Sequence, residues 1–328
     1  MGAPTIAKRN AKGSLLSALS NADSIAVGDG AINGTDTGGY NVAMGKNALR
    51  SVGSGFSNTA IGGNAGYSLS GGAENVAVGA SALNGGSTPV RNVAVGVAAL
   101  SACTSDHNTA VGWYALAANT VGHENTAVGY QALKVNVSGE GNAAFGDGAL
   151  LALISGLQNT GLGQLALGQA TTANWNTGLG HGTHFQLIDG IYNLAAGHEA
   201  GHRPGNNSAF GTKHGSRNTH LGARSGAGDT SDPSNTLALG YYATVIGDGA
   251  VAIGTDSTGA GAGATESNQM ALGTSMHKVK IRGRLNVAPR TPTGSADAQG
   301  QTGDIAADDG YVYVKASTGW KRAALSTF

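Results

Sequence analysis

One short phrase recurs along this chain at a nearly constant spacing. It consists of an asparagine, a short apolar stretch and a glycine, as in Asn75-Val-Ala-Val-Gly79. The opening asparagine occurs at Asn41, Asn58, Asn75, Asn92, Asn108, Asn125, Asn142, Asn159, Asn176 and Asn193. Counted from a weaker copy at Ser24, the step is 17 residues nine times and 16 residues once. Self-similarity at a fixed period indicates a stack of one structural unit.

The length of the unit indicates what kind of stack this is. A unit of 17 residues is too short for a pair of helices, which needs more than about 30 residues, and it fits one coil of a parallel β-solenoid. In the first strand, Val76 and Val78 point to one side and Ala77 to the other. The glycine that follows permits a tight turn. We expect a second strand at Ala82-Leu83 and a loop that leads to the next asparagine.

The repeated asparagines are predicted to be structural. Stacked coils place equivalent residues about 4.8 Å apart, so side-chain amides can bond to those above and below. We therefore predict an asparagine ladder along the stack, rather than a catalytic or ligand-binding role for a residue repeated this often.

The amino-acid composition bears on whether a single chain can form a stable solenoid by itself. The chain has 56 glycines, and only 5% of its residues are aromatic. A thin coil of this kind buries little apolar surface against the entropy lost when so many glycines become ordered. The small alanine face of the strand suggests close approach to another chain. We therefore predict a homotrimer, in which each chain covers the flat faces of the others.

Charge and motifs exclude several classes of function. Formal net charge is zero and the pI is about 7.1, so no basic field attracts nucleic acid. No apolar run approaches the roughly 20 residues needed to span a bilayer, and we expect no membrane insertion. The chain contains neither a Gly-Lys-Ser/Thr phosphate loop nor a nucleophile elbow. We therefore expect no enzymatic activity and no cofactor.

Changes in the sequence pattern along the chain suggest three parts. Residues 1–20 are expected to form an attachment arm, because the apolar stretch after Lys8, Arg9 and Lys12 is too short and broken for a secretory signal. Residues 21–275 form the repeat solenoid, with coils that become irregular after about residue 200. Residues 276–328 are predicted to be a C-terminal β tip that caps the stack.

The C-terminal part contains the candidate binding residues. Lys280 and Arg282 lie on the basic face of an alternating strand, which either touches an acidic glycan or partner protein or is simply solvated. Turn signals then separate apolar runs and predict a small antiparallel meander. Within it, Tyr311, Tyr313 and Trp320 are either the core of the tip or a sugar-stacking surface.

A candidate metal site lies late in the stack. His181 and His198 both follow the glycine of a repeat, so they should stack on adjacent coils. If that column faced a three-fold axis, axial rings of imidazole could bind a metal ion. The alternative is a polar column that faces solvent or a neighbouring chain.

Two parts of the chain resemble known proteins. The Asn-x-Ala-Val/Ile-Gly-x-x-Ala repeats resemble the head repeats of trimeric autotransporter adhesins, and similar repeats occur in fibre proteins of bacteriophages and marine viruses. This resemblance covers about three quarters of the chain and implies a left-handed parallel β-roll that intertwines as a trimer. The run from Gly303-Asp-Ile-Ala to Trp320-Lys-Arg-Ala-Ala-Leu325 resembles a terminal module of phage tail and fibre proteins.

The resemblances imply a structural fibre of a phage-like virion that mediates host-surface attachment or decoration. The N-terminus would bind other virion proteins, and a host glycan or protein would be the receptor, bound with the avidity of three copies. One alternative is a trimeric adhesin of a bacterial surface, although the chain lacks the stalk and anchor of that family. Another is a polysaccharide-cleaving tailspike, which requires two carboxylates about 5 to 10 Å apart. Glu124 and Glu140 lie on neighbouring coils for such a pair, but with offset registers.

Overall fold

The chain divides into two compact units, residues 1–277 and 278–328, and each is described by itself. The computed structural model describes 24–33, 36–201, 214–227, 232–255 and 261–273, together with backbone strands at 8–9, 15–16, 305–307, 311–316 and 319–324. None of the residues described in this way is helical.

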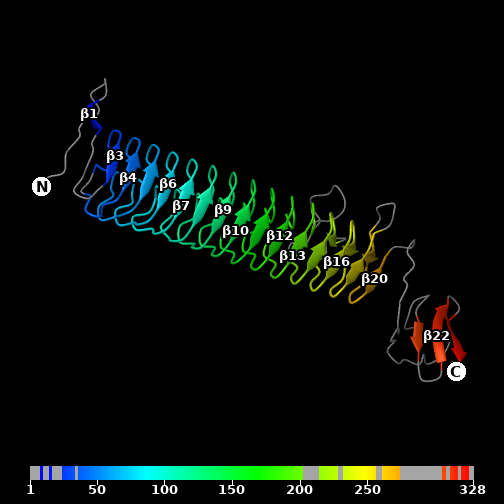
Figure 1. Ribbon diagram of the computed structural model, residues 1–328. Helices are drawn as coiled ribbons and strands as arrows, with labels where there is room; N and C mark the ends of the chain where they lie inside the picture. The colour runs from blue at the N-terminus through cyan, green and yellow to red at the C-terminus, as the bar shows by residue number, and fades with distance from the viewer. Residues whose placement is uncertain are drawn as a thin grey trace. The chain divides into compact units, whose positions relative to one another are not determined.

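The first unit is a parallel β-solenoid built on one 15-stranded sheet (Figure 1). Its strands are β3 (Ile25–Val27), β4 (Val42–Met44), β5 (Thr59–Ile61), β6 (Val76–Val78), β7 (Val93–Val95), β8 (Thr109–Val111), β9 (Thr126–Val128), β10 (Ala143–Phe145), β11 (Thr160–Leu162), β12 (Thr177–Leu179), β13 (Leu194–Ala196), β14 (Thr219–Leu221), β16 (Leu237–Leu239), β18 (Val251–Ile253) and β20 (Met270–Leu272). Each pairs in parallel with the strand of the next coil, as Ala77 does with Ala94. The expected all-β parallel solenoid is confirmed.

The interior of each coil is narrow and lined mainly by alanine and leucine side chains. The middle residue of the strand points inward, and Ala77 and Ala94 are fully buried. They belong to one continuous core with the Ala-Leu pairs of the opposite wall, such as Ala82 and Leu83. The interpretation of the alanines as a face for a second chain is therefore wrong. Alanine is used because little more than a methyl group fits between the strand and the leucines of the same chain.

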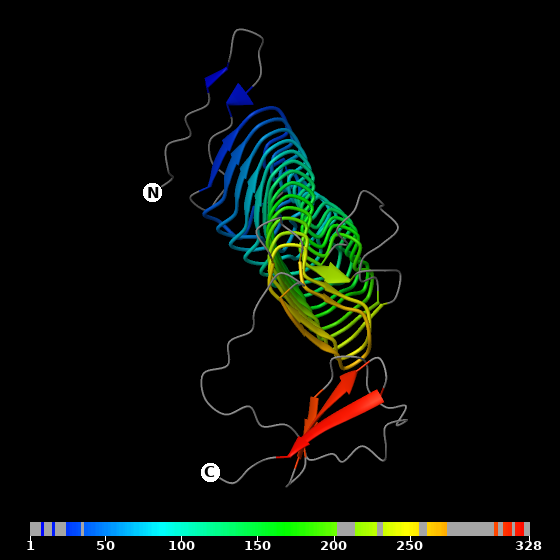
Figure 2. The same cartoon turned by 90° about the vertical axis from the view of Figure 1, so that its right-hand side faces the viewer.

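The wall opposite the strands consists of turns in the regular coils. Ser81 and Leu83 have left-handed φ angles of 57° and 47°, so the backbone there is not extended. The expected second strand is therefore wrong for these coils. Among the described residues it occurs in the last coils, where β15 (Gly226–Ala227), β17 (Thr244–Val245) and β19 (Gly263–Ala264) form a three-stranded parallel sheet. Figure 2, which looks along the stack, shows the coils superposed with the long sheet on one wall.

Glycine at the end of each strand is required by the backbone. Gly79 has a φ of 132°, a conformation that L side chains rarely adopt. A Cβ at this position would lie 2.4 Å from the carbonyl oxygen of Gly96 in the next coil. The glycine column therefore allows the coils to stack at the spacing of a hydrogen-bonded sheet.

The asparagines that open the coils are buried and form a ladder. Asn58 donates from its side chain to Asn41 Oδ1 at 3.2 Å and to the Gly72 carbonyl at 2.8 Å, and its backbone N–H donates to Asn41 Oδ1 at 2.9 Å. The same three bonds recur in most coils. At the single 16-residue step, the backbone of Asn108 still donates to Asn92 Oδ1 at 2.8 Å, while its side-chain amide turns to other acceptors.

Short antiparallel strands occur outside the stack. In the first unit, β1 (Lys8–Arg9) pairs with β2 (Leu15–Leu16). In the second unit, β22 (Tyr311–Ala316) pairs on one side with β21 (Ile305–Ala307) and on the other with β23 (Gly319–Ala324). The alternating segment predicted to be a strand around Lys280 lies outside the described residues.

Candidate functional sites

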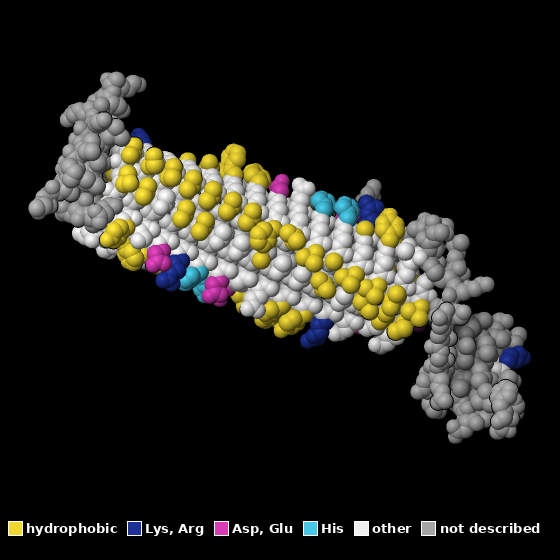
Figure 3. All heavy atoms as spheres, in the orientation of Figure 1, with side chains coloured by type: hydrophobic (Ala, Val, Ile, Leu, Met, Phe, Trp, Pro, Cys, Tyr) yellow, Lys and Arg dark blue, Asp and Glu magenta, His cyan; other side chains and the backbone are white. Residues whose placement is uncertain are grey.

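The outer surface of the long sheet carries two rows of side chains, contributed by the first and third residues of each strand. The third residue is apolar in all 15 strands, from Val27 to Leu272, and the first is threonine in six strands and apolar in the other nine. Several are well exposed, including Ile25 at 52%, Leu162 at 50% and Met270 at 63%. Figure 3 shows hydrophobic side chains in rows along the stack. We call these two rows the outward strand face.

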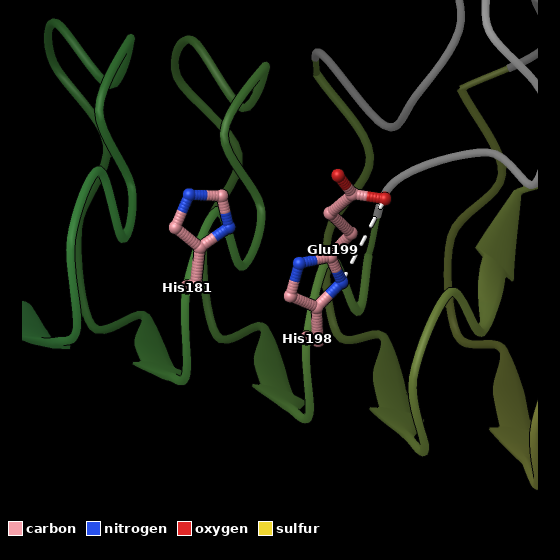
Figure 4. A group of neighbouring side chains, drawn as sticks. All are labelled: His181, His198 and Glu199. Atoms are coloured by element: carbon pink, nitrogen blue, oxygen red, sulfur yellow. Dashed lines mark ion pairs between the residues drawn. The ribbon is translucent and has the colours of Figure 1, made fainter.

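A second candidate site lies on the corner that follows β12 and β13. His181 and His198 come directly after Gly180 and Gly197, which end those two strands. Their rings stack at a centroid distance of 5.0 Å and an interplanar angle of 12°, and both side chains are exposed (Figure 4). The pair therefore lies side by side on adjacent coils, as the sequence predicts.

Glu199 adds a carboxylate to the two imidazoles. One ligand atom from each of His181, His198 and Glu199 lies within 4.8 Å of the other two. The carboxylate Oε2 lies 3.8 Å from His198 Nδ1 and accepts a hydrogen bond from Arg224 Nε at 2.8 Å. Arg224 also donates to the Tyr242 hydroxyl at 2.6 Å. His181, His198 and Glu199 thus form one group of possible metal ligands, and the Arg224 guanidinium lies at its edge.

A small pocket adjoins the group. It has a volume of ≈ 120 Å³ and is lined by Leu165, His181, Gly182, Phe185 and Glu199. Two of its lining residues, His181 and Glu199, are thus also in the ligand group. Sequence reasoning identified the two histidines but missed Glu199 and Arg224. Both could have been found, because they occupy the same repeat position on neighbouring coils, two residues after Gly197 and Gly222.

Comparison of the chain with protein-family models, curated proteins and solved structures finds no match. The fold and the geometry of its sites therefore carry the functional argument. No helix among the described residues is long and apolar enough to cross a membrane.

A third unusual feature is a buried pair of histidines inside the stack. His184 occupies the repeat position that carries leucine in earlier coils, and His220 occupies the inward alanine position of β14. Both are almost fully buried, and their rings meet edge to face at 5.4 Å. Room for them comes from Gly201, which replaces the leucine of the next coil and at which a Cβ would lie 1.7 Å from the ring of His184.

With both rings neutral, the hydrogen bonds of the pair set its proton positions. The Thr236 hydroxyl donates to Asn218 Oδ1 at 2.7 Å, so it accepts from His220 Nε2 at 3.2 Å. His220 Nδ1 then accepts from His184 Nε2 at 3.3 Å, which leaves His184 Nδ1 buried without a partner. Both rings are neutral in this arrangement.

Desolvation favours the same neutral state. Burial lowers the pKa of His220 to about 4, and burial together with the charge that His220 would carry lowers the pKa of His184 well below its usual range. The pair was not predicted as a site, although the loss of alanine and leucine at its two repeat positions is visible in the sequence.

The structure says less about the other predicted site residues. Lys280 and Arg282 lie outside the described residues. Tyr311, Tyr313 and Trp320 lie in β22 and β23, but their side chains are not described. Of the two acids considered as a carboxylate pair, Glu140 contacts His123, with Oε1 and Nε2 3.3 Å apart.

Proposed function

We propose that this chain is the structural fibre of a phage-like virion and that it acts as a homotrimer in attachment to, or decoration of, the host surface. The observation that supports this most directly is the outward strand face, in which the row of third residues stays apolar over all 15 strands of the sheet. In this proposal, residues 1–20 bind other virion proteins, and residues 276–328 contact a host glycan or protein.

The size of the outward strand face supports association. At a strand spacing of about 4.8 Å, 15 strands extend over roughly 70 Å, and two rows of side chains are roughly 10 Å wide. The resulting area, with the six threonines of the first row included, is on the order of 700 Å². It is close to the roughly 800 Å² that each partner buries in a standard interface.

The regular spacing of the outward strand face favours a second copy of the same chain as its partner. A partner that contacts the whole length must repeat at the same interval, and another solenoid of this sequence does so. The resemblance to adhesin head repeats favours three copies over two. A rigid trimeric rod that presents three binding ends suits a fibre, because several weak contacts with a surface add up to strong attachment.

Light scattering on the purified full-length chain tests the assembly. We expect a mass three times the 32.3 kDa of the chain. Replacing Val111 and Leu162 of the outward strand face by lysine should yield monomers, whereas Val121→Lys, at a position 58% exposed but away from the strands, should leave the mass unchanged. A wild-type chain that is monomeric at all concentrations would contradict the trimer.

Competition for host cells tests the biological role. Purified chain added in excess should slow the adsorption of phage particles to susceptible bacteria, and the lysine variant should do so less effectively at equal chain concentration because avidity is lost. Adsorption that is unchanged at saturating wild-type chain would contradict an attachment role.

A further inference from the structure

We propose that His181, His198 and Glu199 form a binding site for one divalent transition-metal ion such as Zn²⁺, which clamps the two adjacent coils that carry β12 and β13. The site lies within a single chain. It is therefore independent of the proposed fibre function and of the oligomeric state.

The donor set suits this class of ion. Imidazole nitrogen favours zinc, copper and nickel, and two histidines with one glutamate and an open position constitute a known type of zinc site. The three ligand atoms already lie within 4.8 Å of one another. Zinc–nitrogen bonds of about 2.1 Å place two nitrogens about 3.4 Å apart in a tetrahedral site. Both rings are exposed, so small side-chain rotations can close the remaining gap.

The sheet holds the backbones of the two histidines at a fixed separation. Gly180 N donates to the Leu162 carbonyl at 2.7 Å, and Gly197 N donates to the Leu179 carbonyl at 2.9 Å. Each histidine thus begins from a backbone position fixed by the sheet. Ligands mounted on a rigid frame lose less conformational entropy on binding than ligands on a flexible loop.

Arg224 opposes metal binding at this site. Its guanidinium donates to Glu199 Oε2 at 2.8 Å, so the carboxylate is already engaged with a cation. A metal ion must either use the other carboxylate oxygen beside this positive charge or displace the guanidinium. Removal of the Arg224 charge should therefore strengthen metal binding, whereas removal of Glu199 should weaken it.

The chain contains its own control site. His123 Nε2 lies 3.3 Å from Glu140 Oε1, and the two side chains are exposed to similar extents, 47% and 46%. This pair has an imidazole and a carboxylate on neighbouring coils but no second imidazole. Among the described residues, the group around His181 is the one in which three possible ligands come together. Metal binding should therefore distinguish His181 from His123.

Isothermal titration with ZnCl₂ tests the clamp. The experiment uses the full chain without a polyhistidine tag, after removal of metal with EDTA. We expect one ion per chain and a loss of affinity of about 10-fold or more for His181→Gln and for His198→Gln. Arg224→Gln should bind more tightly, by about three-fold or more if the guanidinium contributes an opposing charge. His123→Gln should bind as the wild-type chain does.

Cobalt supplies a readout that does not depend on heat. Co²⁺ in a tetrahedral site should give visible absorption bands that are absent in His198→Gln, and circular dichroism spectra should show that the variants remain folded. The clamp would be overturned by the absence of saturable zinc binding below about 1 mM, or by an equal loss in His123→Gln. One ion per three chains would also overturn it, because the imidazoles of different chains would then share an axis.

Discussion

The regular coils and the coils that contain His184 and His220 share one backbone frame but differ in what fills it. In the regular coils an alanine from the strand meets leucines from the opposite wall. In the later coils the same two positions carry imidazoles that bond to each other and to Thr236. Strand pairing continues through both regions, since β13 pairs with β14 and β14 with β16.

This difference shows which residues specify the frame and which only fill it. The glycine that ends each strand and the buried asparagine that precedes it recur in both regions, and their bonds run from coil to coil. The inward residues can change from alkyl to imidazole if a neighbour, here Gly201, gives up volume. Mutations of the glycines and asparagines should therefore lower stability by similar amounts in both regions. Only the inward side chains should make stability depend on pH.

The largest loss of stability is expected on mutation of the glycines that end the strands. Gly79→Ala and Gly197→Ala both force a side chain into φ angles of 132° and 126°, against the backbone of the next coil. Each should lower the free energy of unfolding by more than about 3 kcal/mol, as measured by denaturant titration. Gly63→Ala is the matched control, because a Cβ there has no neighbour within 4 Å. If Gly79→Ala were as mild as Gly63→Ala, the shared frame would not depend on these glycines.

The second-largest loss of stability is expected on mutation of the asparagine ladder. Asn125 Oδ1 accepts from the backbone and the side chain of Asn142 at 3.0 and 3.1 Å, so Asn125→Ala leaves buried groups unpaired. We expect a loss of about 3 kcal/mol there, and a similar loss for Asn218→Ala, whose Oδ1 accepts from Thr236. Hydrogen exchange should show the lost protection in the adjacent strands. Unequal losses would break the similarity between the two regions. Val135→Ala, at an exposed site on a regular coil, serves as the control.

Stability should depend on pH through the coils that contain His184 and His220, and not through the regular coils. Because the pKa of His220 falls to about 4 on folding, the unfolded chain binds a proton that the folded chain rejects between that value and about 6.5. Stability contributed by this group is full above about pH 6.5, declines as the pH falls, and changes no further below about 4. The expected loss is about 3 kcal/mol.

The double variant His184→Leu, His220→Ala restores the residues of the regular coils. Its unfolding free energy should vary less between pH 6.5 and 4 than that of the wild-type chain, measured in parallel by thermal or urea unfolding. An identical pH slope in the two proteins would show that exposed groups, and not this buried pair, control the acid response.

The smallest effect is expected at a surface ion pair of the regular coils. Arg91 Nε and Glu74 Oε2 are 2.8 Å apart, but the side chains are 58% and 44% exposed. Solvent screening limits such pairs, so Glu74→Gln should change the unfolding free energy by about 0.5 kcal/mol or less. A loss above about 1 kcal/mol would mean that surface charges contribute to the frame more than this comparison implies.

Much of the frame could be predicted from the sequence, because one residue type at one spacing has one structural explanation. The 17-residue step predicted the parallel stack, and the histidines at 181 and 198 were placed side by side by that step alone. The direction of Ala77 was misread, because periodicity of two separates the faces of a strand without saying which is inside. The partners of His184 could not be predicted by spacing, because they lie across an irregular step of the chain.

The ladder also explains how such a chain tolerates changes in length. Successive members are separated by 17 residues in most coils, by 16 between Asn92 and Asn108, and by 25 between Asn193 and Asn218, yet the backbone N–H of each bonds to the Oδ1 before it. Register is thus reset once per coil, whatever number of residues lies between. In evolutionary terms, insertions can be accepted at one corner of a coil while the rod keeps its geometry. In engineering terms, the same corner offers a place to display a foreign segment.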